Sequence, residues 1–278
     1  MNKITLLGTG CPSPNHIRYG PSILLEHDGL KFLFDSGSGV TQRLSQIDVK
    51  PSELDSVFIT HMHSDHIVDL YQVYISGWHT GREEPFIIYG PQGVADYFET
   101  ILKAYEKELS NRIKWEKRPN EKGLEYEVIE IEENLNVSKE NISISSIEVD
   151  HYPVDFAYGY KITLNDSKTI VISGDTRYSD NLIHAAKGAD ILIHEVFIEL
   201  AFNEKRMSEI WDAKLNSEDK VYSQSELIEL SRDCDGILCS IVDKFDAETI
   251  NKLSDKVKII SNFAVGFGNI DLKTAKQR

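Results

Sequence analysis

The chain has 278 residues, of which 41% are hydrophobic, enough for one large domain or one domain with an appendage, and this composition excludes wholesale disorder. No apolar stretch approaches the roughly 20 residues of a membrane span, and the N-terminus lacks the apolar segment of a signal peptide. The formal net charge of -15 disfavours a long nucleic-acid footprint but leaves open a short anionic substrate held by a metal ion.

Taken in chain order, short apolar runs bounded by turn residues predict strands, and runs with helical spacing predict helices. The predicted strands cover residues 3–7, 22–26, 31–34, 56–60, 86–89, 142–149, 156–164, 169–173, 190–193 and 237–242. The predicted helices begin near residues 40, 65 and 90, the third ending near 109, and a fourth covers 180–187. Residues 110–140 are acidic and show no clear period, so we expect irregular structure there. This mixture indicates α/β or α+β layers.

The cysteines indicate a reducing compartment. Cys11, Cys234 and Cys239 are odd in number and widely spaced, so they do not suggest a disulfide framework. We therefore predict a cytoplasmic protein. The Gly8-Thr9-Gly10 loop lacks a nucleotide-binding glycine pattern, and we expect it to pack closely beneath a site.

One stretch of six residues concentrates metal-binding chemistry. Residues 61–66 read His-Met-His-Ser-Asp-His, directly after the predicted strand 56–60. Imidazoles and carboxylates bind zinc, iron, copper or nickel, and such a cluster is a poor way to build a core. Five residues of ligand type follow predicted strands: His61, Asp65, His151, Asp175 and His194. Because a rigid sheet holds its strand-end loops in register, we expect them to form one site.

Together these features resemble the metallo-β-lactamase superfamily, in its ribonuclease Z and arylsulfatase-like branch. The matching pieces are Leu6-Leu-Gly-Thr-Gly10, Phe34-Asp-Ser-Gly37, the 61–66 stretch, His151, Ser173-Gly-Asp-Thr176 and Ile193-His-Glu195. The resemblance covers residues 1 to about 200. It implies a four-layer αββα sandwich with the metal ions at one edge.

The resemblance also implies a ligand set. The expected ligands are His61, His63 and His151 for a first ion, Asp65 and His66 for a second, and Asp175 as a bridge. Zinc is the expected metal, with iron and manganese as alternatives, because mixed nitrogen and oxygen sites do not discriminate sharply. Two such ions lower the pKa of a shared water towards 7, and the resulting metal-bound hydroxide attacks phosphorus or a carbonyl.

Asp65 and His194 are the expected catalytic residues. In the related ribonucleases, the histidine that matches His194 helps to protonate the leaving group, and Glu195 is expected to orient it. A purely structural role for His194 is the alternative. Asp35, at the end of a predicted strand, either orients a metal-bound histidine or caps the following helix, and the sequence does not decide between the two.

The sequence departs from the family at the second metal site. The family completes that site with a late histidine, whereas none of the nine histidines here follows His194. A family segment with a histidine ahead of a helix reads Val221–Glu226, with Tyr222 in the approximate place of the histidine. Asp243, after the predicted strand 237–242, is one candidate for the missing ligand, and metal analysis of Asp243→Ala tests it. We expect the second zinc to be held weakly.

The C-terminal stretches Asp235–Lys244 and Val257–Asp271 are similar to part of the substrate domain of D-2-hydroxyacid dehydrogenases. The nucleotide-binding domain and catalytic residues of that family are absent from this sequence, so we expect neither NAD binding nor dehydrogenase activity. We predict a C-terminally incomplete hydrolase domain over residues 1–230 and a short α/β appendage over residues 231–278.

Two functions from different classes remain open. The first is a metal-dependent hydrolase of phosphodiester or related ester bonds, acting on an RNA 3′ end, as in tRNA processing, or on a small anionic ester. The net charge and the lack of an obvious basic Gly/Pro-rich arm weigh against tRNA. The second is a metal-binding protein with impaired or no catalysis. Trp78, Tyr152 and Tyr178 either line the substrate pocket or pack in the core. No membrane partner is expected, and homodimerisation is left open.

Overall fold

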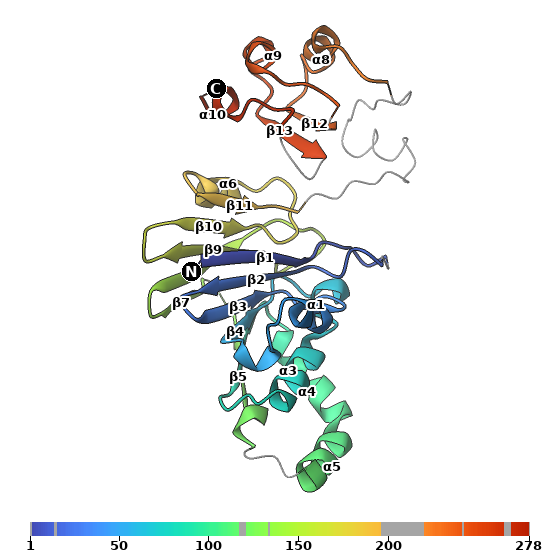
Figure 1. Ribbon diagram of the computed structural model, residues 1–278, viewed down its shortest axis with the longest axis vertical. Coiled ribbons are helices and arrows are strands. Elements are labelled where there is room, and N and C mark those ends of the chain that lie inside the picture. The colour runs from blue at the N-terminus through green and yellow to red at the C-terminus, as the bar shows by residue number, and fades with distance from the viewer. Residues whose placement is uncertain are drawn as a thin grey trace. The chain divides into compact units, whose positions relative to one another are not determined.

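The computed structural model describes residues 2–13, 16–116, 121–132, 134–195, 220–240, 242–263 and 268–277. The chain divides into two compact units, Met1–Phe197 and Ile198–Arg278 (Figure 1). This division lies ahead of the boundary expected after residue 230. The reason is that Leu227 and Tyr222 pack into a hydrophobic core made by the later residues.

The first unit contains two mixed sheets. One has six strands in the order β1 (Asn2–Gly8), β2 (Ser22–His27), β3 (Leu30–Phe34), β4 (Ser56–Phe58), β5 (Phe86–Gly90) and β6 (Tyr126–Glu130). The other has five strands in the order β11 (Ile191–Ile193), β10 (Thr169–Ile172), β9 (Tyr158–Leu164), β8 (Ile142–Glu148) and β7 (Asn136–Lys139). In the first sheet, β3 to β6 run parallel. In the second, β10 and β11 do.

Helices cover the outer faces of both sheets (Figure 1). The helices of the first unit are α1 (Val40–Gln46), α2 (Ser64–Ile67), α3 (Leu70–His79), α4 (Val94–Ala104), α5 (Glu106–Glu116) and α6 (Asp180–Ala186), with short 3₁₀ turns at Pro51–Glu53 and Lys122–Leu124. Helices α1, α3 and α4 pack on the six-stranded sheet, and α6 packs on the five-stranded sheet.

Strand alternation produces the four layers. In β3 and β4, Leu33 and Val57 join the core beneath the helices, whereas the next residues, Phe34 and Phe58, join the core between the sheets. Their rings stack at 5.1 Å, and Tyr160 of β9 meets them from the opposite sheet. The order helices, sheet, sheet, helix confirms the αββα sandwich expected from the sequence.

The expectation of irregular structure over residues 110–140 is wrong. That region holds the end of α5 and the strands β6 and β7. Both strands lie at sheet edges, and α5 has no buried residue. Elements of this kind carry little apolar periodicity, which explains why the sequence pattern did not reveal them.

The second unit is a small α/β arrangement. Its elements are α8 (Gln224–Leu230), β12 (Gly236–Ser240), α9 (Ala247–Lys252), β13 (Ile259–Phe263) and α10 (Leu272–Gln277). The two strands pair in parallel, with α9 between them in the chain. Its buried core contains Leu227, Cys239, Phe245 and Ile250.

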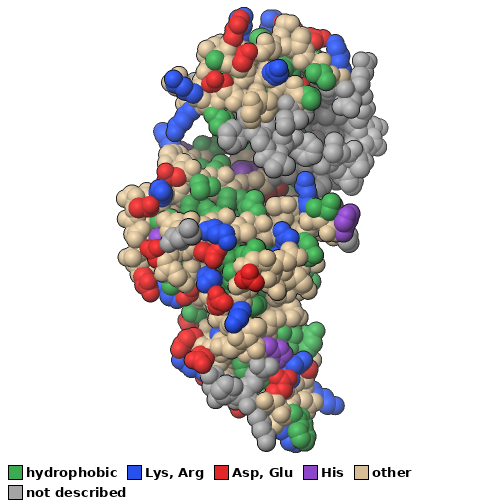
Figure 2. Space-filling view, in the orientation of Figure 1, with side chains coloured by type: hydrophobic (Ala, Val, Ile, Leu, Met, Phe, Trp, Pro, Cys, Tyr) green, Lys and Arg blue, Asp and Glu red, His purple; other side chains and the backbone are tan. Residues whose placement is uncertain are grey.

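The described surface mixes charges of both signs. On the face shown in Figure 2, lysine and arginine side chains are interspersed with aspartate and glutamate and form no continuous basic area. No helix in the described part of the chain is long and apolar enough to span a membrane.

Candidate metal centre

Four of the six predicted ligands form a tight cluster. His61, His63, His151 and Asp175 each bring one ligand atom within 4.8 Å of all the others. His63 Nδ1 lies 2.9 Å from His61 Nε2 and 3.1 Å from His151 Nε2. One ion bonded at about 2.0–2.1 Å to each nitrogen spans separations of this size. Three imidazole nitrogens and a carboxylate therefore fit a divalent transition metal.

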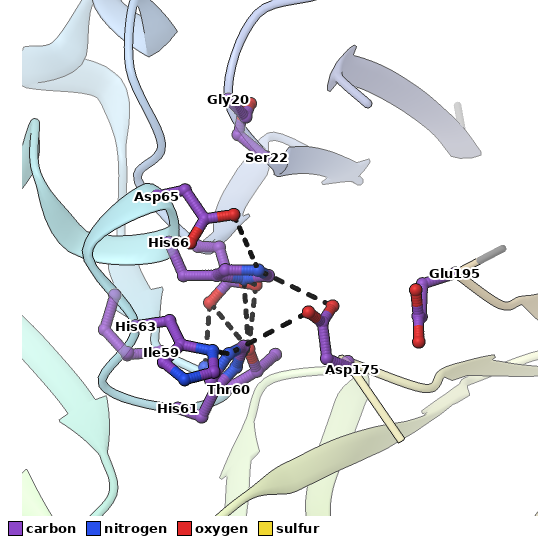
Figure 3. Close-up of polar contacts among 12 residues, drawn as sticks. Gly20, Ser22, Ile59, Thr60, His61, His63, Asp65, His66, Asp175 and Glu195 are labelled. Atoms are coloured by element: carbon purple, nitrogen blue, oxygen red, sulfur yellow. Dashed lines mark hydrogen bonds and ion pairs between the residues drawn. The ribbon is translucent and has the colours of Figure 1, made fainter. Parts of the chain in front are cut away.

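The remaining two predicted ligands lie on the other side of Asp175 (Figure 3). His66 Nε2 is 3.8 Å from Asp65 Oδ2 and 3.5 Å from Asp175 Oδ1. The second oxygen of Asp175 faces the first cluster, 4.0 Å from His61 Nε2 and 3.9 Å from His151 Nε2. Asp175 thus presents one oxygen to each group, as a bridging carboxylate would.

Asp35 orients the His66 ring by contacting Nδ1, the ring nitrogen that faces away from Asp175. It follows β3, and its carboxylate accepts hydrogen bonds from the Thr60 backbone N–H at 2.8 Å and the Thr60 hydroxyl at 2.9 Å. Its Oδ2 is also 2.8 Å from His66 Nδ1. Helix α1 has Gly39 at its N-cap and no side-chain cap. Of the two alternatives for Asp35, the structure therefore shows the orienting contact and not the cap.

These contacts select the ring nitrogens that face the centre. His66 Nδ1–H donates to Asp35, and His61 Nδ1 lies 3.0 Å from the Thr60 hydroxyl oxygen, which accepts its proton. In both rings Nε2 is then the nitrogen that points towards Asp175. Metal-bound histidines are fixed by such contacts to the opposite ring nitrogen.

The pKa values of His61 in the first cluster and His66 in the second group shift in opposite directions. Burial and the neighbouring His66 cation lower the pKa of His61 to about 2, so this ring is neutral. Burial would lower the pKa of His66 as well, but the Asp35 and Asp175 carboxylates raise it to about 10. Burial opposes ionisation of Asp175, yet the hydrogen bond from His66 holds its pKa below the usual range.

Glycines let the loops around the centre approach closely. A Cβ at Gly37 would lie 2.5 Å from the Asp65 carbonyl oxygen and 2.5 Å from the Gly20 carbonyl carbon. A Cβ at Gly8 would lie 1.8 Å from the Gly20 oxygen. The expected close packing of the Gly8 loop is therefore present, and Gly37 continues it to the metal-binding stretch.

His194 and Glu195 follow β11, and their side chains differ in exposure. His194 is exposed, and its Nδ1 donates to the Glu195 main-chain carbonyl at 2.6 Å rather than to the carboxylate. Among the contacts of the described residues, none joins the His194 ring to a predicted ligand. The Glu195 carboxylate instead lies beside Asp175 (Figure 3). From the sequence, Glu195 was expected only to orient His194, although it too follows a predicted strand.

The three aromatic residues separate into core and surface. Trp78 is 2% exposed and belongs to the core beneath the helices. Tyr152 and Tyr178 are 74% and 75% exposed and line a cavity of about 490 Å³ that also includes His151. The Arg177 guanidinium lies 5.3 Å from the Tyr152 ring centroid. The pocket alternative therefore fits the tyrosines, and the core alternative fits the tryptophan.

The other candidate ligand, Asp243, belongs to the second unit. It lies shortly after β12, where its main-chain carbonyl accepts a hydrogen bond from Asn269 Nδ2 at 3.0 Å. Tyr222 also belongs to this unit and packs against its core.

Comparison with known proteins covers both parts of the chain. The family model described as anti-Pycsar protein Apyc1 matches residues 2–223. The catalytic domain of D-isomer specific 2-hydroxyacid dehydrogenases matches residues 197–278, as the C-terminal resemblance indicated.

Curated relatives and solved structures agree with the first match. Ribonuclease Z of Mycobacterium bovis (strain BCG / Pasteur 1173P2) is 36% identical over 218 residues, which cover 76% of this chain and 77% of that protein. Ribonuclease Z of Mycobacterium marinum is 35% identical over the same length. The crystal structure of the short form of human tRNase Z has a TM-score of 0.60 at 24% identity and covers 75% of this chain and 81% of that chain. Over its first 223 residues, the chain belongs to the metallo-β-lactamase superfamily, in the branch of ribonuclease Z and Apyc1.

Proposed function

We propose that this chain is a zinc-dependent hydrolase of phosphodiester or related ester bonds. The observation that carries the proposal is the arrangement of donors around Asp175. Three imidazole nitrogens converge on one of its oxygens, and His66 with Asp65 lies by the other. Two adjacent sites that share a carboxylate suit hydrolysis, because two ions can stabilise both the attacking and the leaving oxygen.

The chain's own residues would prepare such a reaction. Divalent ions, when bound, supply Lewis acidity and a water of lowered pKa. Asp35 and Thr60 hold the rings of His66 and His61 with Nε2 towards the centre. We assign Asp65, half-buried beside His66, to hold the attacking water in line by accepting its hydrogen bond. His194 is the proposed proton donor to the leaving group, its exposed ring held at Nδ1 by the Glu195 carbonyl.

A compact substrate is favoured over a long polyanion. The cavity beside His151 is lined by four carboxylates and one guanidinium, those of Glu148, Asp150, Asp155, Asp180 and Arg177. The Arg177 guanidinium is already engaged by Asp150, at 2.7 and 2.8 Å. An extended phosphate backbone would meet repulsion here and no basic area on the visible face (Figure 2). The matching relatives are named as ribonucleases, whereas the matching family model is not, so the proposal does not require RNA.

The alternative is a metal-binding protein with little catalysis. It is favoured by the second group, because the described residues offer only three donors there, Asp65, His66 and Asp175, and a zinc ion held by them would need water as its fourth ligand. This alternative predicts one tightly held ion and no turnover.

Metal content combined with turnover of bis(4-nitrophenyl) phosphate separates the two functions. The hydrolase predicts two zinc ions per chain and turnover that falls at least 100-fold in His63→Ala. His184→Ala is a matched control, since His184 is exposed on α6 and lies outside the proposed site. One ion without turnover would support the binding protein. Comparing this diester with a precursor tRNA then tests the substrate preference, and faster cleavage of the tRNA would overturn the preference for a compact ester.

A further inference from the structure

His151 differs from His61 and His66 in what holds its ring. The Nδ1 atom of His61 contacts the Thr60 hydroxyl. That of His66 contacts the Asp35 carboxylate. Among the described residues, no group makes a hydrogen bond to Nδ1 of His151, whose Nε2 faces the first cluster. The position of this ring therefore depends on the backbone of its own loop, and contacts that fix the loop also fix a predicted ligand.

Asp150 joins the loop of His151 to the segment that follows Asp175. Its main-chain carbonyl accepts hydrogen bonds from the Arg177 backbone N–H at 2.7 Å and from the Thr176 hydroxyl at 3.3 Å. Its carboxylate oxygens accept from Arg177 Nη2 at 2.8 and 2.7 Å. Two predicted ligands of the first ion are thus only one and two residues away from a shared set of hydrogen bonds.

Arg177 contacts both sequence neighbours of His151. Its guanidinium pairs with the carboxylate of the residue before, Asp150, and lies 5.3 Å from the ring centroid of the residue after, Tyr152. The Asp150 carboxylate also accepts the Tyr152 backbone N–H at 3.1 Å, so the two neighbours are joined to each other. The Arg177 side chain therefore restricts the backbone on both sides of a predicted ligand.

We propose that Arg177, through Asp150 and Tyr152, is a positioning residue that holds His151 in place for the first metal ion. The inference rests on the proposed metal centre but not on the proposed reaction. The Arg177 and Asp150 side chains are 51% and 50% exposed, and exposed ion pairs contribute little to folding stability. The pair should therefore affect metal affinity much more than folding, because it fixes a ligand before the ion binds.

The test measures the affinity of the full-length chain for its first zinc equivalent, by competition with a chromophoric chelator. Arg177→Met keeps the aliphatic part of the side chain but removes the guanidinium. We expect it to weaken zinc binding roughly tenfold, at the lower end of what the loss of a supporting contact costs. Charge alone predicts the opposite, because removing a positive charge near a dication favours its binding. A loss of affinity therefore reports the position of the ligand.

A second background shows whether Arg177 acts through His151. In His151→Ala the ligand is gone, so adding Arg177→Met should weaken zinc binding by less than about twofold. A tenfold loss in both backgrounds would overturn the inference, because Arg177 would then act independently of His151. Unchanged or tighter binding in Arg177→Met alone would also overturn it.

Arg232→Met is the matched control for the loss of an exposed ion pair. Arg232 Nη2 lies 2.7 Å from Glu229 Oε2, in the second unit, which contributes no residue to the predicted cluster. This variant should bind zinc as the natural protein does. With EDTA present, both arginine variants should unfold within about 2 °C of the natural protein. A larger decrease in Arg177→Met alone would show that the pair supports the fold instead of the ligand, and would overturn the inference.

The outcome can be separated from that of the proposed hydrolase. The expected affinities without turnover of bis(4-nitrophenyl) phosphate would remove the hydrolase and leave the role of Arg177 intact. Slower turnover in Arg177→Met at saturating zinc, with zinc affinity unchanged, would place Arg177 against the substrate and overturn the positioning role. A natural protein that binds no zinc would remove both proposals.

Discussion

Asp35 follows β3 and binds residues that follow β4, Thr60 and His66. It has a φ of 59°, a left-handed conformation that aspartate tolerates better than most residues other than glycine. This turn directs its buried carboxylate back to Thr60 and His66, so that three hydrogen-bond donors share it. The carboxylate thereby holds the His66 ring and the backbone just before His61 in one arrangement.

Replacing Asp35 by asparagine should weaken the second metal site. The amide keeps the size of the side chain but loses the charge that favours the His66 Nδ1–H tautomer. Substitutions of such supporting carboxylates typically cost 10- to 100-fold in metal affinity, and we expect a loss in that range. Competition titration with a chromophoric zinc chelator measures it. Asp48→Asn is the control, since Asp48 is exposed and has a similar φ of 58°. Equal affinities in the two variants would contradict this role.

His66 predicts a proton release when the second ion binds. Its pKa of about 10 means that the metal-free ring holds a proton at pH 8, which a metal ion must displace. We expect about one proton released per second-site ion, and an affinity that rises roughly tenfold per pH unit between about pH 7 and pH 10. Calorimetry in two buffers of different ionisation enthalpy measures the release. Identical heats in both buffers would show that His66 binds metal from its neutral form.

At the scale of elements, β9 ties the metal-binding stretch to the opposite sheet. The Tyr158 backbone N–H donates to the Thr60 carbonyl at 2.9 Å, and the Tyr160 hydroxyl donates to the Ile59 carbonyl at 2.6 Å. Both acceptors lie just before His61, where β4 has ended and the chain turns into the site. The second sheet therefore supplies partners to a loop of the first.

Tyr160→Phe should lower the free energy of unfolding by about 1–2 kcal/mol at pH 7, because it leaves the buried Ile59 carbonyl without this donor. The difference should shrink above pH 10. Burial raises the pKa of Tyr160 well above that of an unfolded tyrosine, so only the unfolded chain ionises there and the natural protein loses stability, whereas phenylalanine does not. Urea denaturation at pH 7 and pH 10.5 measures both effects. A gap that widens with pH would contradict this account.

The elements that carry the site were predictable because their physical signals are local. Apolar runs end directly before His194 and one or two residues before His61 and Asp175, and β3 and β4 are apolar on both faces because both faces are buried. Edge strands and exposed helices lack that signal, so α5, β6 and β7 were missed. The environment of Glu195 could not be read from the sequence either, because it depends on the parallel pairing of β10 with β11.

At the scale of the whole molecule, the two parts of the chain resemble two different protein families. The boundary between the two folded units is set by which residues are buried together. Leu227 lies before the expected boundary at residue 230, yet it packs with Phe245, Ile250 and Leu253 of the second unit. Sequence similarity shows which family each segment resembles. The folded units instead consist of the residues whose apolar side chains pack in one core. The two boundaries need not coincide.

Separate cores predict that metal removal destabilises only one unit. Among the described residues, the buried clusters of the first unit contain nothing after Ile193, and that of the second nothing before Tyr222. A metal ion present at 100 times its dissociation constant stabilises the folded form by about 2.7 kcal/mol, or roughly 5–10 °C in a unit of this size. Calorimetry should therefore show two transitions.

Adding EDTA should lower the midpoint of only one of these transitions, that of the first unit, by roughly 5–10 °C. The other should stay within about 1 °C, because no predicted ligand of the cluster lies in the second unit. His63→Ala serves as the control, since its lower midpoint should respond much less to the chelator. A single transition that moves as a whole would show that the two units unfold together and that the ions stabilise both.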